Sequence, residues 1–146
     1  MHPEALDRRP RLAIIAHDGK KADIVAFATF NRERLQRCRL LATNTTGRLL
    51  ADKVGLEVER LESGPLGGDV QIASRIVEGW VDAVVFLVDP LDKHPHDPDI
   101  QTLLRICNVR NVPLASNVAT ADMLITSPLL WGEAEDPARS VGAAWR

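Results

Sequence analysis

Residues 83–88 read Ala-Val-Val-Phe-Leu-Val, the longest apolar run in the chain. This run is far shorter than the roughly 18 residues that a membrane-spanning helix needs, and it does not alternate with polar residues. Segments of strand length that contain apolar residues recur at Leu12–Ala16, Leu40–Ala42, Leu56–Leu61 and Pro113–Ala115, and several of them are short and do not alternate. Short continuous runs of this kind are typical of strands covered on both faces, as in a parallel sheet.

Segments with the helical spacing of apolar residues lie between these runs. They are Lys21–Phe30, Thr46–Val54, Val70–Trp80 and Ile100–Asn108. Strands that alternate with helices predict βαβ units with right-handed crossovers. We therefore expect an α/β fold, a doubly wound and mainly parallel five-stranded sheet with helices on both faces. The 146 residues fit one domain, residues 1–146, with a core at 11–127 and an irregular tail at 128–146.

The composition and the cysteines narrow the class of protein. A formal net charge of -2 at pH 7 gives no general attraction for nucleic acid or an anionic membrane. No apolar run is long enough for a signal peptide or a membrane span. Cys38 and Cys107 stand alone, outside any C-x-x-C spacing, as buried thiols in a reducing compartment do. We expect a cytoplasmic protein with no membrane or nucleic-acid partner.

A polar cluster follows each predicted strand. The clusters are His17-Asp18, Thr43–Gly47, Ser63–Asp69, Asp89–Asp99 and Ser116–Asp122. In an open parallel sheet the carboxyl ends of the strands share one edge, and ligands bind there. The sequence therefore predicts a single site at this edge.

Two of the clusters favour an anionic ligand. Thr43–Gly47 (TNTTG) places hydroxyl groups at the expected start of a helix, where free N–H groups attract anions, although simple N-capping by Thr45 or Thr46 is the alternative. The glycines of Ser63–Asp69 (SGPLGGD) allow a close approach of backbone to ligand. Neither stretch matches a dinucleotide-binding motif or a P-loop. A small phosphorylated ligand fits better than a nucleotide cofactor.

The cluster Asp89–Asp99 (DPLDKHPHDPD) pairs histidines with aspartates. Such pairs suit proton transfer near neutral pH. The alternative is a solvated loop in which Asp97 or Asp99 caps the next helix and Asp89 and Asp92 form Asx turns. The spacing is not that of a zinc site, so we expect no metal.

Three other side chains have a structural and a chemical interpretation. Asp69 is either the N-cap of the following helix or a base at its start. His17 is either a core histidine or an anion contact. Lys21, four residues after His17, would then lie one helical turn along, so that two cations face one anion.

The longer segments around these clusters resemble one known family. LAIIAHDGKKADIVAF (12–27), LLATNTTG (40–47), LESGPLGGDVQIA (61–73), VVFLVDPLDKHPHDPDIQTLLRICNV (84–109) and VPLASNVATADMLI (112–125) together resemble methylglyoxal synthase. The resemblance runs from residue 12 to about residue 127 in the same order. It implies an enzyme that converts dihydroxyacetone phosphate to methylglyoxal and inorganic phosphate, through an enediolate, without cofactor or metal. It also implies a homohexamer.

Position by position, the resemblance makes Asp69 the catalytic base, with His96 polarising the substrate oxygens and Asp99 assisting. It implies substrate and phosphate contacts for His17, Lys21, Thr43, Asn44, Thr45, Thr46, Ser63, Gly64 and His96. Asn44 departs from the glycine usual in the family, and asparagine is the residue that tolerates positive φ next best. Inorganic phosphate, as the product, is expected to inhibit.

A non-catalytic regulatory module of the same fold is the alternative function, like the one attached to carbamoyl phosphate synthetase. The chain shows no second domain for such a module to regulate. It also contains Asp69, His96 and Asp99, which a pure binding module does not require. We therefore expect the enzyme.

Overall fold

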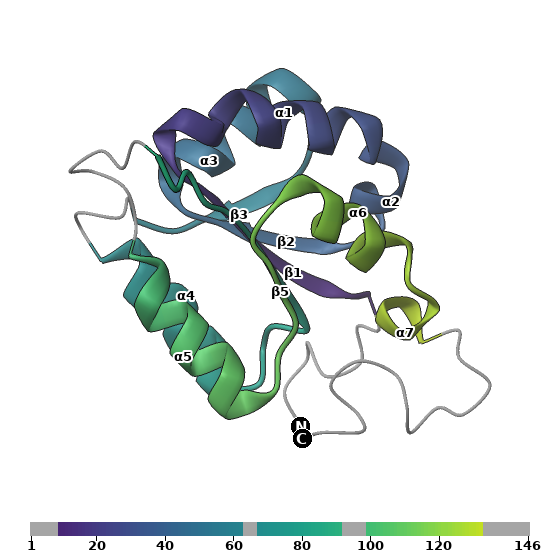
Figure 1. Cartoon of the computed structure of the whole chain (residues 1–146). Coiled ribbons are helices and arrows are strands. Elements are labelled where there is room, and N and C mark those ends of the chain that lie inside the picture. Colours follow the sequence, from purple (N-terminus) through teal and green to yellow (C-terminus); the bar gives the residue numbers. More distant parts are fainter. Residues whose placement is uncertain (1–8, 63–66, 92–98, 133–146) are drawn as a thin grey trace.

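The computed structural model describes residues 9–62, 67–91 and 99–132 (Figure 1). In these segments five strands form one sheet in the order β3-β2-β1-β4-β5, and every neighbouring pair is parallel. The strands are β1 (Arg11–Ala16), β2 (Arg39–Ala42), β3 (Val58–Arg60), β4 (Ala83–Leu87) and β5 (Leu114–Ala115). The predicted fold class is confirmed, and the sheet is parallel throughout.

The four predicted helices are present. They are α1 (Lys21–Phe30), α3 (Asn44–Leu49) continued by the wider turn η3 (Leu50–Val54), α4 (Gly68–Val77) and α5 (Ile100–Arg110). The described chain adds a short turn and three helices that the sequence did not predict: η2 (Asp18–Lys20), α2 (Arg32–Gln36), α6 (Val118–Thr126) and α7 (Pro128–Trp131). No helix in the described ranges has the length and apolar character needed to cross a membrane.

The helices α6 and α7 show why the C-terminal part was misread. Each of these helices begins at a polar capping residue of a type that is also common in loops: the Asn117 side chain accepts a hydrogen bond from the backbone of Thr120 (2.9 Å) and begins α6. In α7, Leu130 is buried in the core, and the indole N–H of Trp131 donates to the carbonyl of Ile125 (2.8 Å). Residues 128–131 thus belong to the packed core and not to an irregular tail.

Alternate side chains of β1 enter two separate cores. Leu12, Ile14 and Ala16 pack with α1, α2, η3, α6 and α7, while Ala13 and Ile15 pack with α4 and α5. Figure 1 shows the first group of helices on one face of the sheet and the pair α4 and α5 on the other. Because both faces are covered at β1, its sequence is apolar without alternation.

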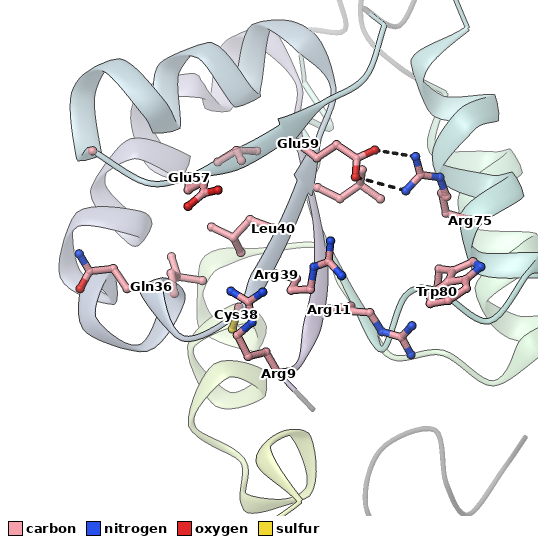
Figure 2. A pocket seen from close by; sticks show the side chains of 14 residues that line it. Arg9, Arg11, Gln36, Cys38, Arg39, Leu40, Glu57, Glu59, Arg75 and Trp80 are labelled. Carbon is pink, nitrogen blue, oxygen red and sulfur yellow. Dashed lines mark hydrogen bonds and ion pairs between the residues drawn. The ribbon is translucent and has the colours of Figure 1, made fainter. Parts of the chain in front are cut away.

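The face of β2 and β3 toward α4 carries charged side chains beside apolar ones. Arg39 lies on this face, as does Glu59, which stands opposite Leu41 in the register. Arg75 of α4 donates to both carboxylate oxygens of Glu59, at 2.5 and 3.4 Å (Figure 2). Here an ion pair adds to the apolar packing of Leu41 and Leu61 against the core on this face.

Candidate active site

The strand order sets the ends of β1 and β4 side by side. The chain runs outward from β1 through β2 to β3, then crosses to the other side of β1 to form β4. Ligands in open α/β sheets bind at such a switch point, beyond the carboxyl ends of the strands. His17 directly follows β1, and Asp89 follows β4 two residues beyond its end. The predicted meeting of these two clusters is observed.

His17 is 2% exposed, and its ring packs edge-on against Phe86 with centroids 5.2 Å apart. Its Nδ1 accepts a hydrogen bond from the backbone N–H of Asp89 (2.9 Å). A ring that accepts at Nδ1 is neutral and carries its hydrogen on Nε2. His17 is therefore a neutral donor in this arrangement, and not the second cation that the sequence suggested.

Lys21 connects the end of β1 with the start of α3. Its ammonium donates to the carbonyl of Ala16 (2.6 Å) and to the hydroxyl of Thr46 (2.8 Å). The lysine side chain is half-buried and Thr46 is fully buried. A positive charge is thus held, by two short hydrogen bonds, next to the first turn of a helix.

Thr43 is buried at the N-cap of α3, and the helix begins at Asn44. Thr45 and Thr46 lie inside the first turn, so the alternative that one of them is the N-cap is wrong. First-turn N–H groups have no partner within the helix, and together with the helix dipole they favour an anion. The threonines therefore surround a site with anion-binding character.

Asn44 takes up a helical conformation as the first residue of α3. Among the described residues other than glycine, Asn111 alone has positive φ. The tolerance of asparagine for a left-handed conformation is therefore not needed at position 44. Replacing the glycine usual in the resembling sequences imposes no backbone strain at this position.

Asp69 is the second residue of α4, after the N-cap Gly67 (φ 96°) and Gly68. The prediction that Asp69 is itself the N-cap is wrong by two positions. Its half-buried carboxylate accepts a hydrogen bond from the backbone N–H of Val70 (3.0 Å). The group is therefore a fixed carboxylate at the positive end of a helix.

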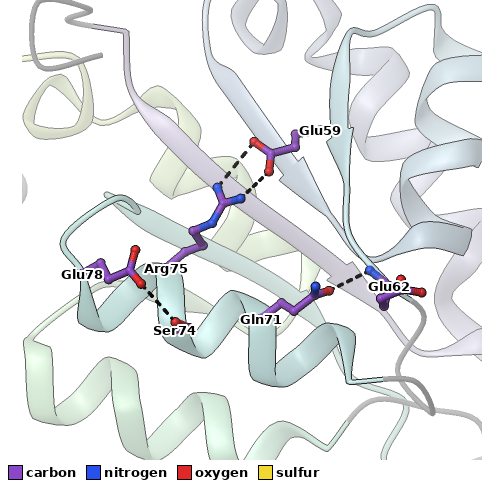
Figure 3. Close-up of polar contacts among 6 residues, drawn as sticks. All are labelled: Glu59, Glu62, Gln71, Ser74, Arg75 and Glu78. Atoms are coloured by element: carbon purple, nitrogen blue, oxygen red, sulfur yellow. Dashed lines mark hydrogen bonds and ion pairs between the residues drawn. The ribbon is translucent and has the colours of Figure 1, made fainter. Parts of the chain in front are cut away.

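The backbone of Glu62 holds the start of α4 in place. Its N–H donates to the side chain of Gln71 (2.8 Å; Figure 3), and its carbonyl accepts from the backbone of Asn44 (3.4 Å). Gly68 packs so closely on that carbonyl that an added Cβ would overlap it. The backbone of a single residue after β3 thus connects the starts of α3 and α4, which carry the threonines and Asp69. Sequence reasoning missed Gln71, because nothing in the sequence indicates its contact with Glu62.

A family model described as the MGS-like domain matches residues 23–116. Over 117 residues the chain is 62% identical to the methylglyoxal synthase of Cupriavidus pinatubonensis, covering 80% of this chain and 90% of that protein. The chain belongs to the methylglyoxal synthase family. It is 54% identical over 120 residues to the methylglyoxal synthase of Ralstonia nicotianae, covering 82% of this chain and 89% of that protein. The crystal structure of methylglyoxal synthase from Elizabethkingia anophelis NUHP1 superposes with a TM-score of 0.82 at 42% identity, covering 86% of this chain and 82% of that one.

Of the other candidate site residues, some lie within the described ranges and others lie outside them. Asp99 is an exposed N-cap of α5 that accepts from the backbone of Gln101 (2.9 Å), and Asp89 forms the expected Asx turn with the N–H of Leu91 (3.0 Å). Ser63, Gly64, His94, His96 and Asp97 lie outside the described residues. Within the described ranges no three His, Cys, Asp or Glu side chains are grouped so as to hold a metal ion.

One predicted cluster does not converge fully on this edge. Asp122, the last residue of Ser116–Asp122, accepts a hydrogen bond from the side chain of Asn31 (3.1 Å). Asn31 follows the far end of α1, whose first residue is Lys21 at the candidate site. The last five residues of the cluster are helical, and the helix carries Asp122 away from the edge where the sequence predicted it.

Both cysteines are buried free thiols, as the sequence predicted. Burial raises the pKa of Cys38 to about 12 and that of Cys107 to about 11. The neutral thiol is therefore the form present near neutral pH, which makes these groups poor nucleophiles.

Proposed function

We propose that this member of the methylglyoxal synthase family converts dihydroxyacetone phosphate to methylglyoxal and inorganic phosphate. The observation that carries the proposal is the connection through the Glu62 backbone. It supports a site in which Asp69, at the start of α4, acts next to the threonine turn that Lys21 contacts. A base next to an anion site is what removal of a proton from a phosphorylated ketone requires.

The first step is proton transfer to Asp69. A C–H group beside a carbonyl is a weak acid, so the carboxylate must be ionised and within about 3 Å of it, directly or through one water. The electron pair of that bond moves toward the carbonyl oxygen and forms an enediolate. His96 donates to the substrate oxygens, with Asp99 assisting, and lowers the energy of that anion.

The second step is loss of phosphate. The hydroxyl group on the deprotonated carbon gives its proton to the leaving phosphate and becomes the aldehyde C=O, the enediolate double bond shifts to form a new C=C bond, and the C–O bond to phosphate breaks with its electron pair going to the phosphate. The resulting enol takes up a proton to give methylglyoxal. The leaving phosphate is bound by a cradle of donors and one cation: His17, Lys21, Thr43, Asn44, Thr45, Thr46, Ser63 and Gly64. In this cradle His17 acts through its Nε2–H, and Lys21 supplies the charge.

Turnover by the purified protein tests the function directly. Incubation with dihydroxyacetone phosphate should release methylglyoxal and inorganic phosphate in equal amounts. Binding of the substrate without release of either product would contradict the enzyme and support the regulatory module instead.

The reaction is proposed to need no metal, because every step is a proton transfer or an elimination that side chains support. Activity should be unchanged after exhaustive treatment with EDTA and gel filtration. A loss that added zinc or magnesium restores would contradict this mechanism.

The protein is further proposed to be a single-domain cytoplasmic enzyme and a homohexamer. The family resemblance supports the assembly, and two buried free thiols support a reducing compartment. Exposed apolar side chains on the outer helices, Phe30, Val70 and Met123 among them, offer surface for contacts between subunits. Light scattering after gel filtration should give six times the monomer mass, and a monomeric mass at micromolar concentration would exclude the hexamer.

A further inference from the structure

The first turn of α4 is attached to the backbone of Glu62 on both sides of Asp69. Before Asp69, Gly68 packs directly against the Glu62 carbonyl. After Asp69, the side chain of Gln71 accepts a hydrogen bond from the N–H of Glu62 (2.8 Å; Figure 3). The backbone N–H of Gln71 also donates to the carbonyl of the N-cap Gly67 (3.0 Å). Gln71 thus closes the helical turn around Asp69 and attaches that turn to the chain leaving β3.

The other contacts near the start of α4 are local or non-directional. The N-cap Gly67 has no side chain that could hold the turn, and the carboxylate of Asp69 accepts from the N–H of its own neighbour Val70 (3.0 Å). Ile72 is fully buried in the core, and apolar contact of this kind sets no direction. A hydrogen bond depends on angle as well as distance, so the contact of Gln71 restricts how α4 can rotate about its axis.

The backbone of Glu62 extends this attachment to the anion site. Its carbonyl accepts from the N–H of Asn44, the first residue of α3 (3.4 Å), and Thr46 in the same turn accepts from Lys21 (2.8 Å). A shift of α4 relative to Glu62 therefore changes the distance from the carboxylate of Asp69 to the threonine turn. Misplacing a reacting group by about 1 Å can cost roughly 100-fold in rate.

We propose that Gln71 is a positioning residue, which sets the place of the Asp69 carboxylate relative to the bound phosphate. It acts through the turn that carries Asp69, and not by contact with the substrate. The inference rests on the proposed function, because it assigns a role within that reaction. Gln71 controls kcat, whereas Lys21 controls the binding of phosphate.

Steady-state kinetics with dihydroxyacetone phosphate test this role in Gln71→Ala. Loss of the acceptor should lower kcat roughly tenfold, because the turn that carries Asp69 can then rotate. The inhibition constant of inorganic phosphate should keep its wild-type value, since the substitution leaves the phosphate cradle intact. Gln71 is exposed and alanine favours a helix, so the thermal midpoint should stay within a few degrees of that of the wild type.

Two matched variants complete the test. Ser74→Ala removes an exposed hydrogen bond one turn further along α4, from the Ser74 hydroxyl to Glu78 (3.2 Å; Figure 3), and kcat should not change. Gln71→Glu keeps an oxygen that accepts from the N–H of Glu62, so it should recover most of the wild-type kcat. The assays use about 0.15 M salt, at which the added charge is screened beyond roughly 8 Å.

Several results would overturn the positioning role. They are a wild-type kcat in Gln71→Ala, no recovery in Gln71→Glu, or an equal fall of kcat in Ser74→Ala. An inhibition constant for phosphate that weakens as much as kcat falls would make Gln71 a general support of the site, and would overturn the role as well. Absence of turnover in the wild type is a different result, because it would overturn the proposed function and this inference with it.

Discussion

The two ends of the sheet hold polar groups in different ways. At the carboxyl end His17, Thr43 and Thr46 are at most 3% exposed, and backbone or lysine donors hold His17 and Thr46. At the amino end the side chains of the ion pair between Arg75 and Glu59 are 38% and 48% exposed. Groups of the first kind are fixed before a substrate arrives, whereas groups of the second kind compete with water and salt.

This difference predicts where substitutions are costly. Removing one partner of a buried hydrogen bond costs roughly 1–3 kcal/mol, because the other partner stays buried and unsatisfied. An exposed ion pair contributes roughly 0–1 kcal/mol. Substitutions at the carboxyl end should therefore lower both activity and stability, whereas substitutions at the amino end should change them little.

Apart from substitution of the proposed base Asp69, Lys21→Ala is expected to have the largest effect at the carboxyl end of the sheet. Loss of the cation should raise the KM for dihydroxyacetone phosphate roughly ten- to hundredfold, since hydrogen bonds to charged groups are worth about 1.5–3 kcal/mol. Inhibition by inorganic phosphate should weaken in parallel. Lys20→Ala is the matched control: Lys20 forms a partly exposed ion pair with Asp23 (3.6 Å), and its loss should leave KM unchanged. Equal KM values for both variants would place the phosphate elsewhere.

A smaller effect, on stability first, is expected for Gly68→Ala. The new methyl group would overlap the Glu62 carbonyl, so the start of α4 must move, at a cost of roughly 1–3 kcal/mol in the free energy of unfolding. Because Asp69 moves with it, kcat should fall as well. Gly47→Ala is the control, since its Cβ would meet only the flexible side chain of Arg60 (2.5 Å). Denaturant titration should show a loss for Gly68→Ala and less than about 1 kcal/mol for Gly47→Ala; similar losses would mean that the contact at Glu62 is not special.

The smallest effect is expected at the amino end, for Arg75→Gln. The exposed ion pair with Glu59 should contribute no more than about 1 kcal/mol, and the difference from wild type should shrink in 1 M salt. Thermal unfolding at two salt concentrations measures this. A loss of several kcal/mol, insensitive to salt, would show that the two ends of the sheet do not differ as described.

The sequence predicted the sheet well because a parallel sheet requires a simple pattern of apolar residues along the chain. Strands covered on both faces appear as unbroken apolar runs, and the intervening helices show their buried stripe. The pattern failed where a polar residue caps a helix. Ser127 begins α7, which was predicted to be part of an irregular tail, and Asn117 begins α6, whose first residues were predicted only as a polar cluster after the fifth strand. Capping residues and loop residues are the same types, so composition alone does not separate them.

The sequence indicates candidate residues for the site but not the contacts among them. That Asp89 holds His17 depends on β1 and β4 being neighbours, which the order along the chain does not reveal. The contact between Gln71 and Glu62 depends in the same way on how α4 packs beside the end of β3. The state of His17, a neutral donor, follows from such a contact and was therefore missed.

The central claim is that the carboxylate of Asp69 removes the proton, and Asp69→Asn tests it most directly. Asparagine keeps the size of the side chain and an oxygen that accepts from the N–H of Val70, so the thermal midpoint should stay close to that of the wild type. It does not accept the substrate proton, so kcat for dihydroxyacetone phosphate should fall by roughly 10²–10⁴-fold. A kcat near the wild-type value would make Asp69 a structural residue of α4 and would move the base to Asp89 or Asp99.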